Sequence, residues 1–281
     1  MINEMDINYH ISFNVNNEQE FVEFLKTEKL FEPDSGYIGA FDILQSDPRW
    51  ETVKRFVDSH SLLCHADSVF SQEELLQAQW LRIRSCWHVG YPQPEGNFKY
   101  ETITYSCENH CKECGIGLEQ IAPFRIKNAP RWTSRHFMML NWVSDELFLD
   151  DTAKAILEDA SLTGISFGEV QNKNGSAIVP GVYQLKVQPL PNEGLIPERS
   201  PIRSTIVCEK CGATRYHPHG VGKYTFRKEI FDDAPDIVKT AELFGWGHSS
   251  AHLILIRQCV YRLLVEKKLI RDLEFSPIDL L

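Results

Sequence analysis

The chain has 281 residues, 43% of them hydrophobic and 24% charged, so it is long enough to bury a substantial core in one large or two smaller domains. Its formal net charge of −10 makes a nucleic-acid partner unlikely to be favoured, because phosphate recognition depends on clustered Lys and Arg. An acidic protein is better suited to capture a basic protein partner by electrostatic steering. The sequence shows neither the pattern of a signal peptide nor an apolar run near the roughly 18 residues of a membrane helix, so we expect a cytoplasmic protein without membrane contact.

The first part of the chain carries three helix signals. Each is a capping residue followed by apolar residues: Asn17 with Glu20 before residues 21–30, Asp47-Pro48 before residues 50–57, and Ser71 with Glu74 before residues 75–81. An aromatic, turn-rich stretch follows from Trp87, and residues 100–105 resemble a strand. We therefore predict a mainly helical segment over residues 1–105, ending in an aromatic approach to the next part of the chain.

Two Cys-x-x-Cys-Gly knuckles stand 97 residues apart, Cys111-Lys-Glu-Cys114-Gly115 and Cys208-Glu-Lys-Cys211-Gly212. In such a turn, backbone amides donate to the first sulfur, and the glycine permits a positive φ where the chain turns back. One knuckle supplies half of a tetrahedral thiolate shell, so the fold should bring both around one ion. The sequence predicts a structural Zn²⁺ held by Cys111, Cys114, Cys208 and Cys211.

Other residues near the knuckles leave alternatives open. Cys107, Cys111 and Cys114 also have the Cys-x3-Cys-x2-Cys spacing of the radical SAM iron–sulfur loop, but that interpretation leaves the second knuckle unexplained. Cys107, His110, His217 or His219 could join the metal site or only flank it. His248 and His252 are four residues apart, but the glutamate of a His-Glu-x-x-His motif is missing between them.

The segments that follow the knuckles resemble each other. Residues 155–170 align without gaps on residues 263–278, and Trp142 falls on Trp246 at a spacing four residues smaller. Each aligned segment should be the end of a helix that leads into a strand. A stretch with several prolines from Pro189 to Pro201, after the strand-like residues 181–187, is expected to link the two halves.

We therefore predict an α+β fold with two related knuckle-helix-strand units that share a split zinc-ribbon site. The expected segments are residues 1–105, a first repeat over residues 106–190 and a second repeat over residues 191–281. The acidic pairs Asp145-Glu146 and Asp150-Asp151 lie near the start of the first repeat's helix, where they complement the helix dipole. No general acid or base is visibly paired with them, and no catalytic residue is predicted.

The doubled knuckle and the closing stretch from Leu273 to Ile278 make the chain similar to the bacterial double-CXXCG motif family. The similarity is greatest over residues 208–278, and it is weak before Trp80. Members of that family include immunity proteins that protect cells from the toxins of their own kin. Here the first knuckle follows about 110 residues, whereas the family pattern places it nearer the start.

The resemblance and the acidic charge together favour a zinc-stabilised binding protein, an immunity or antitoxin-type inhibitor of a protein toxin. Such an inhibitor would cover the toxin's active site through a few aromatic anchors, and the candidates are Trp87, Tyr91, Trp132 and Trp246. Two alternatives remain: an enzyme with a His and carboxylate active site near residues 87–105, and a zinc-ribbon adaptor for nucleic acid.

Overall fold

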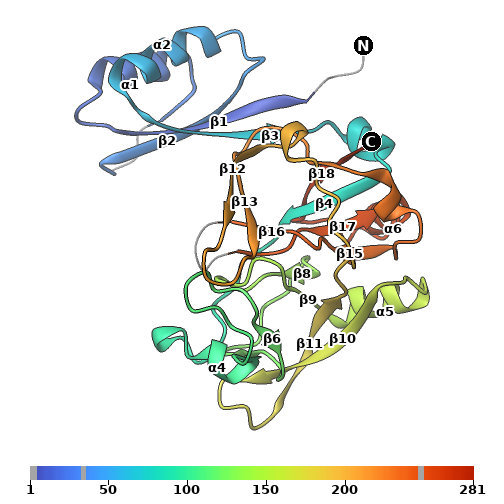
Figure 1. The fold of residues 1–281 in the computed structure, drawn as a ribbon. Helices are drawn as coiled ribbons and strands as arrows, with labels where there is room; N and C mark the ends of the chain where they lie inside the picture. The colour runs from blue at the N-terminus through green and yellow to red at the C-terminus, as the bar shows by residue number, and fades with distance from the viewer. Residues whose placement is uncertain (1–4, 33–35, 246–249) are drawn as a thin grey trace. The chain divides into compact units, whose positions relative to one another are not determined.

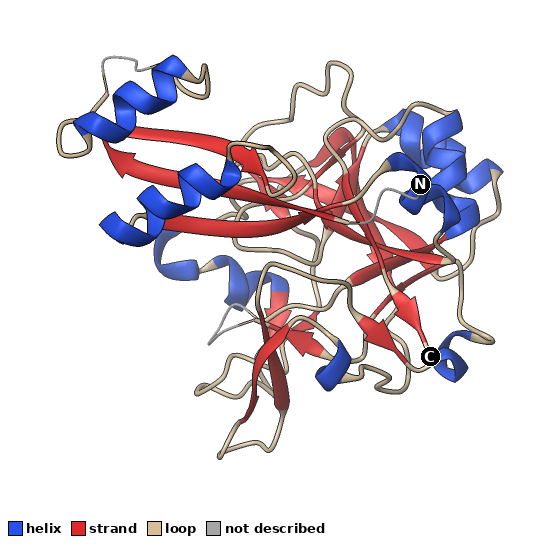
Figure 2. Cartoon of the chain, turned by 90° about the horizontal axis from the view of Figure 1, so that it is seen from above, coloured by secondary structure: helices blue, strands red, loops and turns tan. Residues whose placement is uncertain are grey.

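The structure is a computed structural model that describes residues 5–32, 36–245 and 250–281. It divides into two compact units, and each is described by itself. The smaller unit comprises the chain up to Glu74 with residues Gly220–Gly222, and the larger one comprises Leu75–His219 with Lys223–Leu281. Helices and strands both occur throughout the described chain, which is compatible with the expected α+β class (Figure 2).

The smaller unit is a three-stranded antiparallel sheet with two helices. Its strand order is β2-β1-β3, and its elements follow the chain as β1 (Asp6–Asn14), α1 (Gln19–Thr27), β2 (Ile38–Leu44), α2 (Trp50–His60) and β3 (Leu63–Val69). Both helices cover the same face of this sheet (Figure 1). Their buried residues pack with the inward-facing side chains of β1 and β2 in one hydrophobic cluster.

The expectation of a mainly helical N-terminal segment is wrong, because half of its structure is sheet. Ile7, Tyr9, Ile11 and Phe13 alternate with polar residues along β1, and that period of two is the pattern of a strand with one buried face. The two predicted helices over the apolar runs are confirmed as α1 and α2. Asn17 does not cap α1, since the N-cap is Glu18 and its side chain makes no capping bond.

Two local predictions at the end of this segment need correction. Ser71 and Glu74 do form a reciprocal capping box, with N–H to side-chain distances of 2.9 and 3.2 Å. The helix that they cap, α3 (Gln72–Gln77), ends early, and the chain enters β4 (Trp80–Ser85), whose apolar residues are buried in a sheet. Residues 100–105, expected as a strand, form α4 (Tyr100–Thr104) and only then a short strand.

The larger unit contains two main sheets. The first has the order β7-β10-β11-β9-β8, and the second has the order β15-β17-β4-β18. The strands of the first are β7 (Arg125–Ile126), β8 (Phe137–Met138), β9 (Leu147–Leu149), β10 (Ile165–Asn172) and β11 (Ile178–Val187). Those of the second, besides β4, are β15 (Ile237–Lys239), β17 (Ile254–Arg257) and β18 (Glu274–Pro277). Helix α5 (Asp151–Asp159) joins β9 to β10, and α6 (Gln258–Glu266) joins β17 to β18.

Smaller ladders complete this unit. They pair β5 (Tyr105–Ser106) with β6 (Glu119–Gln120), β12 (Ile202–Val207) with β13 (Thr214–Pro218), β13 with β16 (Leu243–Phe244), and β14 (Thr225–Phe226) with β19 (Asp279–Leu280). Short 3-10 turns lie at Gly96–Phe98, Pro197–Arg199 and Lys228–Phe231.

Each main sheet holds a central strand that comes from the other half of the chain. β4 precedes the first knuckle, yet it lies between β17 and β18, which follow the second knuckle. β11 precedes the second knuckle and lies between β9 and β10, which follow the first. All four of these pairings are antiparallel, so the two sheets exchange equivalent strands.

After leaving its sheet, each exchanged strand makes one bridge to the other sheet. His88 bridges Met139, where Met139 N–H donates to Trp87 O and Val89 N–H donates to Met139 O, both at 2.9 Å. Pro189 bridges Lys239 through the matching pair of bonds, at 2.9 and 2.8 Å. The exchange therefore ties the two halves of the larger unit together through backbone hydrogen bonds.

The proline-containing stretch from Pro189 to Pro201 is packed into this unit instead of forming an open linker. Leu190 and Leu195 are buried with Phe226 and Val238 in one hydrophobic cluster. The expected strand over residues 181–187 is confirmed as the second part of β11.

Candidate metal centre

The two knuckles have the same backbone geometry. In the first, Gly115 N–H donates to Cys111 O at 2.8 Å, and Cys111 N–H donates to Ile116 O at 2.8 Å. In the second, Gly212 N–H donates to Cys208 O at 2.8 Å, and Cys208 N–H donates to Ala213 O at 2.9 Å. Gly115 and Gly212 have φ of 76° and 74°, so each glycine meets the positive-φ requirement that the sequence predicts.

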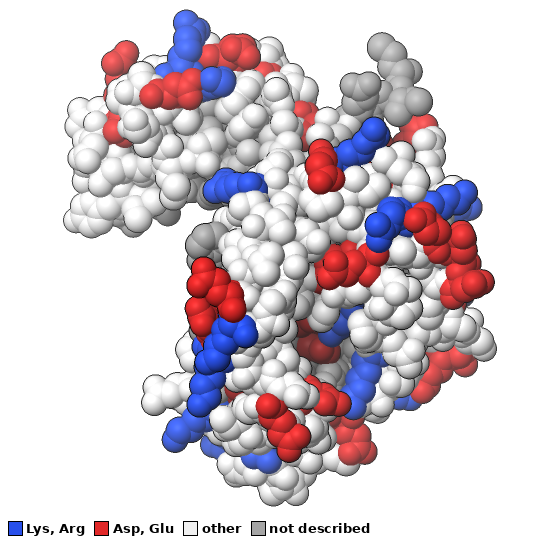
Figure 3. Space-filling model, in the orientation of Figure 1, with Lys and Arg blue, Asp and Glu red and all other residues white. Residues whose placement is uncertain are grey.

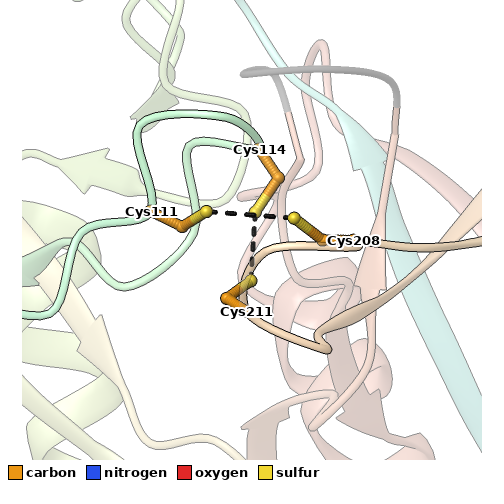
Figure 4. A group of neighbouring side chains, drawn as sticks. All are labelled: Cys111, Cys114, Cys208 and Cys211. Carbon is orange, nitrogen blue, oxygen red and sulfur yellow. Dashed lines mark hydrogen bonds between the residues drawn. The ribbon is translucent and has the colours of Figure 1, made fainter.

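Each knuckle is the tip of a hairpin, the first between β5 and β6 and the second between β12 and β13. The structure brings the two tips together, and the ligand atoms of Cys111, Cys114, Cys208 and Cys211 all lie within 4.8 Å of one another. Their sulfurs point toward a common centre (Figure 4). Cys111 Sγ is 3.9 Å from Cys208 Sγ, and Cys114 Sγ is 3.5 Å from Cys211 Sγ.

These distances fit a tetrahedral metal. A zinc–sulfur bond of about 2.3 Å places the sulfurs of a regular tetrahedron about 3.8 Å apart, which is close to both measured separations. The donor set is four sulfurs, and three of the cysteines are buried while Cys211 is exposed. The four cysteines can therefore hold a metal ion, and the chemistry of the set favours zinc.

Backbone amides already favour the thiolate form at the first cysteine of each knuckle. Hydrogen bonds from the amides of Cys114 and Glu113 lower the pKa of Cys111 to about 6. The amides of Cys211 and Lys210 likewise lower the pKa of Cys208. Burial raises the pKa of Cys114 to about 12, so this thiol needs the charge of a metal to ionise at neutral pH.

The other candidate ligands lie elsewhere. Cys107, His110, His217 and His219 do not belong to the group of four, and Cys107 is exposed. His252 Nδ1 lies 3.2 Å from Glu242 O, and its backbone N–H donates to Asp145. His248 and Trp246 lie outside the described residues, so the proposed His248 and His252 pair and the Trp142 and Trp246 match are not described.

The acidic pairs before α5 have different roles. Asp150 is the N-cap of α5, and its Oδ1 accepts the Ala153 N–H at 2.8 Å, as expected for an acidic residue at a helix start. Asp145 and Glu146 precede β9, so their interpretation as dipole-complementing residues is wrong. Glu146 instead lies 2.6 Å from Lys239 Nζ, and Asp145 lies 3.5 Å from it.

These three charged residues are part of a cavity that the sequence did not reveal. Its volume is about 540 Å³, and its lining includes Asp145, Glu146 and Lys239. Burial raises the pKa of Glu146 despite the nearby lysine, and burial opposes the charge of Lys239, yet the two carboxylates raise its pKa. No local motif marks this cavity, because its walls come from segments up to about 150 residues apart in the chain.

The predicted aromatic anchors are mostly packed. Trp87 and Trp132 lie half-buried against a hydrophobic cluster, and Trp132 Nε1–H donates to Gly181 O at 3.1 Å. Tyr91 is 38% exposed and contacts Trp142, which is 46% exposed and was not among the predicted anchors. The exposed aromatic surface therefore centres on Trp142.

Comparison of the chain with protein-family models and with curated proteins gives no match. Among the described helices, none has both the length and the apolar character needed to cross a membrane.

Proposed function

We propose that this chain is a zinc-stabilised binding protein that acts as an immunity or antitoxin-type inhibitor of a protein toxin. The observation that carries the metal part is the closed group of four cysteines on two hairpin tips. Four thiolates leave no coordination position for a water, so the ion's role is to hold the hairpins together. Binding activity then belongs to the surfaces that the ion keeps in place.

We also propose that the larger unit arose from two related halves. The exchanged strands and matched bridges support this, as does a further pair of parallel contacts: β7 meets β10 at Arg125 and Gln171, and β14 meets β19 at Thr225 and Asp279. Helices α5 and α6 are 107 residues apart, whereas these strand contacts are 108 apart at β10 and β19. The gapless alignment of residues 155–170 with residues 263–278 therefore slips by one residue within the helix.

The inhibitor part of the proposal is supported by charge and by exposed aromatic residues. The formal net charge of −10 favours encounter with a basic protein. Tyr91, Phe98 and Trp142 expose 38%, 50% and 46% of their surfaces, and aromatic side chains of this kind dominate the energetics of protein interfaces. Inhibition would be steric: the acidic, aromatic surface covers the toxin's active site.

The other functions stay less favoured predictions. On the face drawn in Figure 3, Lys and Arg are interspersed with Asp and Glu, and such a mixture gives little support to a nucleic-acid adaptor. An enzyme would need its reacting groups in a cavity, and the cavity beside Lys239 is the place where such an activity would be sought.

A survival assay tests the proposed function. The chain's gene is deleted from its own host, and the toxin gene encoded beside it is then expressed. We expect the deletion strain to die and a plasmid-borne copy of the chain to restore growth. A Cys208→Ser copy should protect poorly, because it loses a ligand of the group of four. Equal survival of the deletion strain and its parent would contradict an immunity role.

A further inference from the structure

The cavity beside Lys239 has a charged floor. Lys239 is 8% exposed, and its Nζ lies 2.6 Å from Glu146 Oε1 and 3.5 Å from Asp145 Oδ2. Gln184 Nε2–H donates to the second oxygen of Glu146 at 2.8 Å. The floor is therefore an ordered ionic network in which two carboxylates share one lysine.

The fold itself does not need charged residues at these positions. Met139 makes the same backbone bridge in the first half that Lys239 makes in the second, and Met139 is buried and apolar. Glu146 immediately precedes β9, and the residue that precedes β17 in the same way is the buried Leu253. Apolar residues thus satisfy the matching positions, and burying ions instead costs desolvation free energy. This difference between the halves indicates a role in binding.

The walls of the cavity add negative charge. Glu101 and Glu119 line it, and neither has an ion-pair partner among the described residues. Together with the floor, the lining holds four carboxylates and one lysine, so it attracts a cation and repels an anion.

An aromatic rim lies at this cavity. Trp142 is part of the lining, and its ring centroid lies 4.5 Å from that of Tyr91 and 4.6 Å from that of Phe98. Trp142 also has φ of 71°, a left-handed conformation that is rare for a bulky residue and costs about 1–3 kcal/mol. The backbone is thus held in a strained conformation at an indole that is almost half exposed.

We propose that this cavity receives one arginine side chain of a basic protein partner, with the guanidinium against Trp142 and hydrogen-bonded to the Glu101 carboxylate. A guanidinium suits the site because it is planar, stacks on aromatic faces and pairs with carboxylates through two parallel bonds. The Asp145, Glu146 and Lys239 network supplies a rigid, net negative floor behind it. This inference rests on the proposed function, because it identifies the chemistry by which that partner is recognised.

The test uses the full-length, zinc-loaded chain and acetyl-arginine amide as the probe, followed by NMR. We expect a saturable shift of the Trp142 indole N–H and of the Gly117 backbone N–H. Acetyl-citrulline amide, a neutral analogue of similar shape, should give no saturable shift. Glu101→Gln should weaken arginine binding at least about fivefold, and Trp142→Ala, read at Gly117, at least about tenfold.

Glu274→Gln is the matched control, because Glu274 is exposed on β18 and is not part of the cavity lining. Its affinity for the probe should equal that of the wild type. Equal binding of arginine and citrulline compounds, or wild-type affinity in both cavity variants, would overturn the inference.

The survival assay separates this inference from the proposed function. If the probe binds as expected but the deletion strain resists the toxin, the immunity role fails and the cation site stands. If the chain protects cells and the Trp142→Ala variant protects them fully, the cavity is not the partner's contact and the inference fails.

Discussion

Glu242 illustrates how one buried carboxylate organises a loop of the larger unit. Only 1% of its surface is exposed, and its Oε1 accepts the N–H groups of Gly194 and Leu195 at 2.5 and 2.6 Å. Both amides belong to the stretch that the sequence presents as a linker. Hydrogen bonds to a charged acceptor are stronger than those between neutral groups, so this side chain replaces the missing secondary structure there.

Glu242→Ala should leave these two amides buried without an acceptor. Each unsatisfied buried group costs about 1–3 kcal/mol, so we expect the free energy of unfolding to fall by about 2–4 kcal/mol. Glu242→Gln keeps one carbonyl oxygen and should cost less than about 1.5 kcal/mol. Urea denaturation measures both variants against Glu274→Ala, an exposed control. Equal losses for the Ala and Gln variants would show that the two hydrogen bonds are not the cause.

At the scale of the element, the sequence predicts a chemical motif better than it predicts the strands around it. The four metal-binding cysteines come together as their spacing and chemistry indicate, because a tetrahedral ion needs all four. The strand signal of β1 is also present, as Ile7, Tyr9, Ile11 and Phe13 alternate with polar residues. Helix-capping residues later in that segment drew attention away from it.

Other elements could not be read locally. β4 is a central strand only because β17 and β18, about 170 residues later, pair with both of its edges. Residues 100–104 have strand-forming side chains, yet tertiary contacts hold them in the short helix α4 with Tyr100 and Thr104 buried. The cavity depends on the same long-range exchange, which brings Glu146 and Lys239 together from positions 93 residues apart.

The strands β9 and β15 make the charged floor testable by copying the apolar residues of the matching positions. Lys239→Met alone leaves Glu146 and Asp145 buried without their cation, and it should lower the free energy of unfolding by about 3–5 kcal/mol. The double variant Lys239→Met with Glu146→Leu removes the pair together. It should recover at least half of that loss, because a buried ion pair is often replaceable by packed apolar residues.

Chemical denaturation of the wild type, both single variants and the double variant completes a double-mutant cycle for the pair. A double variant that is as unstable as the sum of the two singles would mean that Lys239 and Glu146 do not interact favourably. It would also remove the argument that the matching positions are interchangeable.

At the scale of the whole molecule, the metal centre closes a long loop. The ligands on the two hairpins are 97 residues apart, and they connect segments whose strands are already exchanged between the two main sheets. A cross-link of this kind restricts the unfolded chain and stabilises the assembled unit. Loss of the ion should therefore destabilise the larger unit as a whole, beyond the knuckle loops.

We expect about one zinc per chain by elemental analysis. Cys111→Ser or Cys208→Ser should abolish stoichiometric zinc and lower the free energy of unfolding by several kcal/mol, because the unfolded chain has no preformed site for the ion. Cys259→Ser is the control, since Cys259 is exposed and outside the group of four. A chelator should lower the melting temperature of the wild type, and added zinc should restore it. Iron with acid-labile sulfide in place of zinc, or full zinc content in both ligand variants, would contradict this assignment, because neither result is compatible with a single ion shared by the two hairpins.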